Sequence, residues 1–171
     1  MKNLNKMVLA AIVLVATATN VNAQATATAS ATATIVTPIS IVKDVDMNFG
    51  NIAVQAANPG TVTLPPTLAA VRTKTGGVTL PAVTGTVTAA KFTVNGTSGY
   101  LYNITLPSSA VTLSDGASHT MDATSFVNSA AGTLTGGTED FYVGATLAVA
   151  AAQTPGVYTT ATPFSVTVNY N

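Results

Sequence analysis

Strict alternation of apolar and polar side chains is the feature that most constrains the fold of this chain. From Pro163 to the last residue, the apolar side chains of Phe164, Val166, Val168 and Tyr170 alternate with small polar ones. A period of two is typical of a β-strand with one buried face. Burial of these four side chains would contribute roughly 6–10 kcal/mol of transfer free energy. Because a domain nets only about 5–15 kcal/mol of stability, we expect this terminal strand to be fixed in a core.

The same alternation also runs through an early part of the chain. Thr or Ser separates successive alanines between residues 25 and 33, and Ile35 continues the odd-numbered apolar series up to Phe49. The alternation with β-branched Thr overrides the helix preference of alanine. We therefore predict an extended arm over residues 24–34 and a first structural strand from Ile35 onward, with Pro38 at a kink or edge position. The alanines of the arm are Ala25, Ala27, Ala29, Ala31 and Ala33.

Residues 1–23 have the pattern of a secretory signal peptide. Lys2 and Lys6 give a positive start, an apolar run follows over residues 7–18, and small residues precede a cleavage site after Ala23. A membrane anchor is the alternative, but it needs about 20 apolar residues and Thr17 interrupts the run. We expect an exported protein that is located in the periplasm, on the outer cell surface or outside the cell. Its mature form, from residue 24, is not expected to span a membrane.

The charge and composition of the chain limit the kinds of partner that it is expected to bind. Without Lys2 and Lys6, four basic and six acidic side chains remain, which gives a net charge near −2. No basic stripe is present to neutralise phosphates, so a nucleic-acid partner is not expected. Only 7% of the residues are charged, against about 25% in ordinary soluble domains. Such a surface has little electrostatic repulsion and tolerates close packing against copies of itself.

Short alternating segments with frequent turn signals continue through the rest of the chain. Their spacing is about 8–12 residues, and no window has the 3.6-residue apolar period of a helix. This pattern predicts an all-β fold, an immunoglobulin-like antiparallel β-sandwich over residues 35–171, with a closed barrel as the alternative. The expected internal strands are residues 61–64, 67–73, 78–80, 91–94, 100–106, 111–113, 119–127 and 143–151, with residues 157–158 leading into the last strand.

The chain has few residues from which a catalytic site could be built. His119 is the only histidine, Asp122 lies three residues away, and no serine in a nucleophile-elbow setting accompanies them. We interpret His119 as a surface histidine with a satisfied hydrogen bond. The prediction is a protein that is not an enzyme and that carries no cofactor.

Acidic residues occur in two short segments of the sequence, and the first of them resembles part of a calcium-binding loop. Asp44, Asp46 and Asn48 have the spacing of the start of an EF-hand loop, but Phe49 occupies the position that requires glycine. A solvated strand face is the preferred interpretation of these three residues. The neighbouring pair Glu139–Asp140 is expected to face solvent in a Gly-rich loop. No metal site is predicted.

The tyrosines offer one further possibility. They could form a platform on which sugars stack, although tyrosines of a sandwich without Trp are more often found at the rim of the core. The residues concerned are Tyr100, Tyr102, Tyr142, Tyr158 and Tyr170.

Four motifs in order resemble a known bacterial family. They are Asp46-Met-Asn-Phe-Gly50, Val143-Gly-Ala-Thr-Leu147, Gly156-Val-Tyr158 and Val166-Thr-Val-Asn-Tyr170. In this order and spacing they resemble the secreted family called domain of unknown function 4402. The ends of the chain are also similar, more distantly, to spore coat protein U domains and to chaperone–usher pilins.

The resemblance to pilins implies an incomplete immunoglobulin-like fold whose missing strand is supplied by the arm of a neighbouring subunit. The arm Ala25–Ala33, with Ile35, would then be the donor, and Phe164–Tyr170 the strand on the acceptor side. The implied partners are copies of this chain or other surface subunits, with a periplasmic chaperone and an outer-membrane usher. We therefore expect a non-enzymatic, fimbria- or pilus-like surface subunit. The alternative is a monomeric envelope binding module, for carbohydrate or with an adhesin-like role.

Overall fold

The computed structural model describes residues 24–171. Residues 24–35 contain no helix or strand, and Val36–Asn171 is a separate compact unit, which we call the domain. The predicted signal peptide, residues 1–23, lies outside the described residues.

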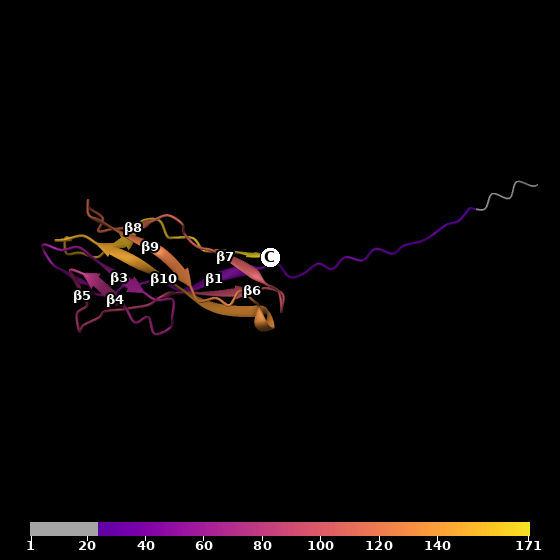
Figure 1. Ribbon diagram of the computed structural model, residues 1–171, viewed down its shortest axis with the longest axis horizontal. Coiled ribbons are helices and arrows are strands. Elements are labelled where there is room, and N and C mark those ends of the chain that lie inside the picture. Colours follow the sequence, from indigo (N-terminus) through magenta and orange to yellow (C-terminus); the bar gives the residue numbers. More distant parts are fainter. Residues whose placement is uncertain (1–23) are drawn as a thin grey trace, which may run out of the picture. The chain divides into compact units, whose positions relative to one another are not determined.

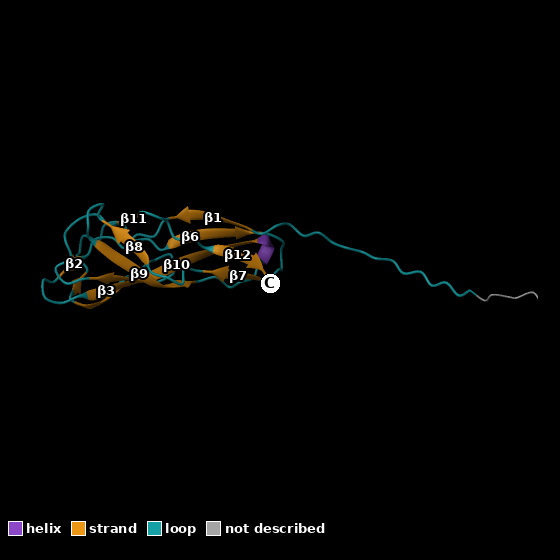
Figure 2. Ribbon diagram, turned by 90° about the horizontal axis from the view of Figure 1, so that it is seen from above, coloured by secondary structure: helices purple, strands orange, loops and turns teal. Residues whose placement is uncertain are grey.

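The domain is an all-β structure in which every strand pairing is antiparallel, as predicted (Figures 1 and 2). Within residues 24–171 the one helical element is a short 3-10 turn, Thr135–Gly137. The strands are β1 Ser40–Val45, β2 Ala53–Val54, β3 Gly60–Leu64, β4 Thr73–Gly76, β5 Val78–Thr79, β6 Ala90–Asn95, β7 Tyr102–Thr105, β8 Val111–Ser114, β9 Thr120–Asn128, β10 Thr138–Val149, β11 Thr159–Thr160 and β12 Thr167–Tyr170.

The long strand β10 organises the main sheet. Its first half pairs with β6 and its second half pairs with β3, while β9 lies along its other edge. β1 extends the sheet beyond β6, β4 beyond β3, and β8 and β11 beyond β9, which gives eight strands in all. Gly144 lies between the two halves of β10 and is buried. A Cβ at this position would lie 2.1 Å from the carbonyl oxygen of Leu64, so the change of partner along β10 requires a glycine.

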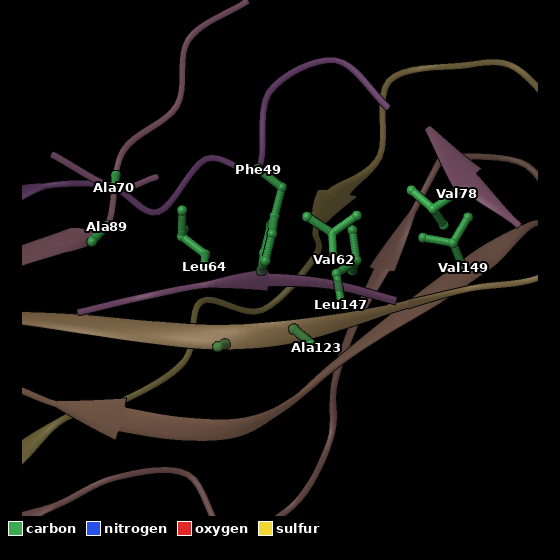
Figure 3. Packing of buried hydrophobic residues seen from close by; sticks show 10 residues of the cluster. Phe49, Val62, Leu64, Ala70, Val78, Ala89, Ala123, Leu147 and Val149 are labelled. Carbon is green, nitrogen blue, oxygen red and sulfur yellow. The ribbon is translucent and has the colours of Figure 1, made fainter. Parts of the chain in front are cut away.

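Two small sheets, β7–β12 and β2–β5, pack on the main sheet and complete the sandwich. The core forms two clusters. One cluster joins β2 and β5 to β3, β9 and the second half of β10, and Figure 3 shows Phe49, Val62 and Leu147 facing one another in it. The other cluster joins β7 and β12 to β6 and the first half of β10, around the stacked rings of Phe92 and Phe141. Met47 and Phe126 contact both clusters.

A bulge in β9 places Phe126 between the clusters. Ser125 and Phe126 together lie opposite Ala145, because the register with β10 shifts at this point. Ser125 has a positive φ of 52°. The extra residue changes which face the following side chains occupy. Ala123 and Phe126 therefore both face the core, although three positions separate them.

Three expected strand boundaries were wrong. The first strand begins at Ser40 instead of Ile35, because Pro38 has no N–H and the polar groups of Thr37 bond to Thr97 and Tyr170. The last strand begins at Thr167 instead of residue 164. Residues 67–72 form a turn and loop, and the expected strand there begins only at Thr73.

Candidate functional site

An open apolar groove of about 1150 Å³ lies on one half of the sandwich. Its floor is the inner face of the main sheet, formed by residues of β8, β9 and β10. Ala123, Leu147 and Val149 are buried at the bottom of the floor, and the flanking side chains are only half-buried. The floor residues are Val111, Leu113, Met121, Ala123, Phe126, Leu147 and Val149.

Two chain segments form the sides of the groove. The first wall is residues 46–54, which follow β1 and include β2. The second wall is residues 152–160 together with Pro163 and Phe164, the connection from β10 through β11 toward β12. Among the lining side chains of the described domain, Asp46 is the one that carries a charge. The groove therefore suits an uncharged, largely apolar occupant.

The first wall is paired on its outer side. Asn48 exchanges backbone hydrogen bonds with Thr88 at 2.8 and 3.0 Å, and the N–H of Asn51 donates to Thr84 O at 2.7 Å. Further along, β2 pairs with β5. Within residues 24–171, residues 46–52 of this wall have no assigned strand pairing besides the bridge between Asn48 and Thr88.

Arg72 holds the bend in the first wall. Its guanidinium donates to the carbonyl oxygen of Phe49 and, at 2.9 Å, to that of Asn51. Gly50 lies between these two residues with φ +67°. Burial lowers the pKa of Arg72, and the two carbonyl bonds compensate its charge in place of a carboxylate. Arg72 thereby fixes the position of the wall without lining the groove.

Tyr158 and Gln153 hold the second wall. The hydroxyl of Tyr158 donates to Thr154 O at 2.7 Å and accepts from Nε2 of Gln153 at 2.9 Å. The same amide nitrogen lies 3.2 Å from Thr120 O, at the start of β9. The second wall is thus held by hydrogen bonds within itself and to the first residue of β9.

The predicted acceptor residues of the last strand lie mainly in the second core cluster. Val168 is buried there, while Val166 and Tyr170 are partly buried against it. Phe164 is the one of the four that also lines the groove, and its ring lies 5.1 Å from that of Phe126. The inward direction of the four side chains was predicted correctly. The alternation does not indicate which of these side chains lie in the core and which of them line the groove.

Tyr170 fastens the point at which the chain enters the domain. Its hydroxyl donates to Thr37 O at 2.8 Å and accepts from the N–H of Thr97 at 2.7 Å. The N–H of Thr37 in turn donates to Oγ1 of Thr97 at 3.0 Å. The predicted donor residues Ala25, Ala27, Ala29, Ala31, Ala33 and Ile35 precede this point and have no assigned strand.

His119 has an aspartate partner, but this partner is Asp115 and not Asp122, the aspartate that lies three residues away in the sequence. Its Nδ1 lies 2.6 Å from Oδ2 of Asp115 in the turn between β8 and β9. Asp122 instead accepts a 2.7 Å hydrogen bond from the Thr112 hydroxyl. The pair His119–Asp115 is a surface contact in a turn, and neither residue lines the groove.

This pair predicts a pH dependence of stability. Hydrogen bonds from the His119 side chain and the N–H of Ala117 lower the pKa of Asp115. A carboxyl group with a lowered folded-state pKa stabilises the fold above its unfolded pKa of about 3.9. This contribution is lost as the pH falls through the folded-state pKa. Urea unfolding of Asp115→Asn and wild type should therefore differ at pH 6, and the difference should shrink as the pH falls below about 3.9. A difference that stays constant over this range would contradict the prediction.

The three residues with EF-hand-like spacing have separate partners. Oδ2 of Asp44 and Oδ1 of Asp140 lie 2.7 and 2.6 Å from Oγ1 of Thr93, which can donate to one of them at a time. Lys91 pairs with both carboxylates. The pKa of Asp140 is lowered by its hydrogen bond with Lys91, and that of Lys91 is raised by the same bond.

The other two members of that motif serve local structure. Asp46 pairs with Lys43 at 2.6 Å, and Oδ1 of Asn48 accepts from the N–H of Gly50 at 2.8 Å. No group of three or more His, Cys, Asp or Glu side chains that could hold a metal ion occurs within residues 24–171.

The expectation that Glu139 and Asp140 lie in a loop was wrong, because both belong to β10. Glu139 accepts hydrogen bonds from the Tyr102 hydroxyl at 2.9 Å and from the N–H of Ala131 at 2.5 Å. Burial, followed by the bond to Glu139, raises the pKa of Tyr102. The carboxylate thus joins β10 to β7 and to the preceding loop.

The tyrosines have different environments. Tyr102 is buried, so its ring is not available for stacking with a sugar. Tyr158 lies in the second wall of the groove, and the rings of Tyr100 and Tyr170 contact each other at 5.5 Å near the chain entry. These tyrosines therefore do not form one continuous platform for sugar stacking.

The comparisons with known proteins identify a family. The family described as Domain of unknown function (DUF4402) matches residues 39–170, which covers nearly all of the domain. No curated protein and no solved structure matches the chain. The more distant resemblance to spore coat protein U domains and to pilins stays a prediction. Across residues 24–171, the structure contains no helix of the length and apolar character needed to cross a membrane.

Proposed function

The chain belongs to the DUF4402 family, and from that premise we propose that it is an exported, non-enzymatic structural subunit of the cell surface. The subunit assembles with copies of itself, or with other surface subunits, into a fimbria- or pilus-like structure. Assembly occurs by addition of an extended strand, the arm of residues 24–34, to a neighbouring subunit. A periplasmic chaperone and an outer-membrane usher are the proposed assembly partners.

The observation that carries the proposal is the open groove over one half of the core. Side chains of the sandwich floor that a further strand would cover are only half-buried there. A wall that is paired on one side only, beside an apolar floor, is the arrangement to which an added strand contributes both main-chain hydrogen bonds and alternate side chains. Support also comes from the arm itself, which has the alternation of a strand.

Deletion of residues 24–34 tests the proposal. The truncated protein should remain a folded monomer, with an unchanged β-type far-UV spectrum, and should form no filament in negative-stain micrographs. A matched control keeps the composition of the arm but groups its alanines and threonines into blocks, which removes the alternation. This control should also fail to assemble. Filaments formed by the truncated protein as readily as by wild type would refute the role of the arm.

The alternative function is a monomeric envelope binding module, for carbohydrate or with an adhesin-like role. One observation favours it, since Tyr158 lies in a groove wall next to half-buried apolar side chains. Aromatic side chains at the side of a groove can stack with a sugar ring. Under this alternative, micrographs of the purified protein should contain isolated particles only, and oligosaccharide should quench the fluorescence of Tyr158.

A further inference from the structure

We infer that the strand acceptor is the groove over the first core cluster, and that the first wall, residues 46–54, pairs with the arm of a second copy of this chain. The inference rests on the proposed assembly by strand addition and names its binding site. It differs from the expectation drawn from the sequence, in which the last strand, Phe164–Tyr170, receives the donor.

The inward side chains of the last strand are already packed or hydrogen-bonded within the domain. The side chain of Val168 is 8% exposed, and the hydroxyl of Tyr170 already bonds to Thr37 and Thr97. β7 pairs with β12 along one edge, and within the described domain the other edge of β12 has no assigned strand. By contrast, the floor side chains Leu113 and Met121 are half-buried beside a wall that is paired only on its outer side. An added strand would therefore bury more apolar surface in the groove than along β12.

The groove is large for a small molecule. Ligand pockets usually enclose about 300–1000 Å³, whereas this groove encloses about 1150 Å³ and is open to solvent. A chain segment fits such a shape better than a compact ligand. In the first wall, the carbonyl oxygens of Phe49 and Asn51 already accept from Arg72, which leaves the backbone groups of Met47 and Ile52 for a segment in β conformation.

The arm matches the groove in charge and in pattern. Residues 24–35 contain no charged side chain, and Asp46 is the one charged side chain that lines the groove in the described domain. An extended strand turns alternate side chains to opposite faces. The alanines and Ile35 would face the apolar floor, and the Thr and Ser side chains would face solvent. Eleven residues in β conformation span about 36 Å, enough to run along the whole first wall.

The position of Thr37, where the arm joins the domain, favours the arm of a second copy as the occupant of the groove. Thr37 is held by Thr97 and Tyr170, beside the end of the domain where β10 begins. The groove lies along the second half of β10, next to Leu147 and Val149. Because Thr37 is fixed there, the chain's own arm would have to fold back along the domain to reach this groove. The residue before a proline prefers an extended conformation, and both backbone polar groups of Thr37 are already bonded.

Disulfide trapping tests the inference, because the chain has no cysteine of its own. Full chains carrying Ala29→Cys are mixed with full chains carrying Met121→Cys, a half-buried floor position. Oxidation should give a covalent dimer on a non-reducing gel. Thr28→Cys is the matched control, since its side chain would point away from the floor. Its yield should be roughly tenfold lower, because a disulfide needs Cβ atoms about 3.5–4.5 Å apart.

Further pairs of cysteine variants distinguish between the possible reasons for an unexpected trapping result. Val111→Cys is a second floor position in case Met121→Cys unfolds the domain, and Asn169→Cys, mixed with Thr28→Cys because both side chains would face solvent, reports on β12. Trapping mainly at Asn169→Cys would overturn the groove as acceptor but leave strand addition intact. A chain with both Ala29→Cys and Met121→Cys that closes only within itself would overturn the second copy as donor. Absence of trapping at every position would overturn the inference, and arm-independent filaments would separately refute the proposed function.

Discussion

Phe141→Ala is expected to lower the free energy of unfolding by about 4 kcal/mol, as found when a fully buried aromatic ring is removed from a core. Phe141 has no exposed surface, and its ring stacks on that of Phe92 with centroids 5.5 Å apart. The substitution leaves a cavity in the second core cluster, between the main sheet and the β7–β12 pair. A loss of this size is a large fraction of the stability of an ordinary domain.

Urea unfolding followed by circular dichroism measures this effect. Val157→Ala is the control, because Val157 is 82% exposed and its truncation should change the stability by less than about 0.5 kcal/mol. A loss below about 1 kcal/mol for Phe141→Ala would show that the second cluster is not tightly packed.

Gly144→Ala is expected to destabilise the domain by about 3 kcal/mol, through crowding instead of a cavity. The new Cβ would lie 2.1 Å from Leu64 O and 2.8 Å from atoms of Pro65 and Pro66. These are backbone and ring atoms, which cannot rotate away as the end of a flexible side chain can. The pairing of β10 with β3 must therefore shift.

Gly156→Ala provides the matched control for this prediction. The nearest atoms to a Cβ at Gly156 lie 3.6 and 3.8 Å away, which is ordinary van der Waals contact. The two variants should be compared by thermal and urea unfolding. If Gly144→Ala were as stable as Gly156→Ala, the close approach of β3 to β10 at this point would be wrong.

The fold class could be predicted because alternation acts locally. A side chain that changes face at every residue needs only its own sequence to be recognised, and this holds for Phe164–Tyr170 and for most inner strands. The same reasoning failed at residues 35–39. Alternation there gives no information about a hydrogen-bonding partner, and a strand exists only where one is present. Thr37 bonds instead to a side chain and to the Tyr170 hydroxyl.

The groove could not be predicted from the sequence. Its floor comes from β8, β9 and β10, and its walls come from two segments about a hundred residues apart. The position of Phe126 in the floor depends on the bulge at Ser125, which breaks the alternation by one residue. Arg72, which holds the first wall, gives no signal in the sequence, because its partners are backbone carbonyl groups.

The sequence by itself determined the strand-forming pattern and the inward face of the last strand, because each depends on residues close together in the chain, and it determined the family through short motifs whose order along the chain is itself sequence information. The tertiary structure decided which inward residues are covered. Val168 is enclosed because β12 pairs with β7 over the second cluster, whereas Leu113 and Met121 stay half-exposed because no strand lies over them in the described domain. Burial depends on which strands become neighbours, and that is settled only when the whole chain packs.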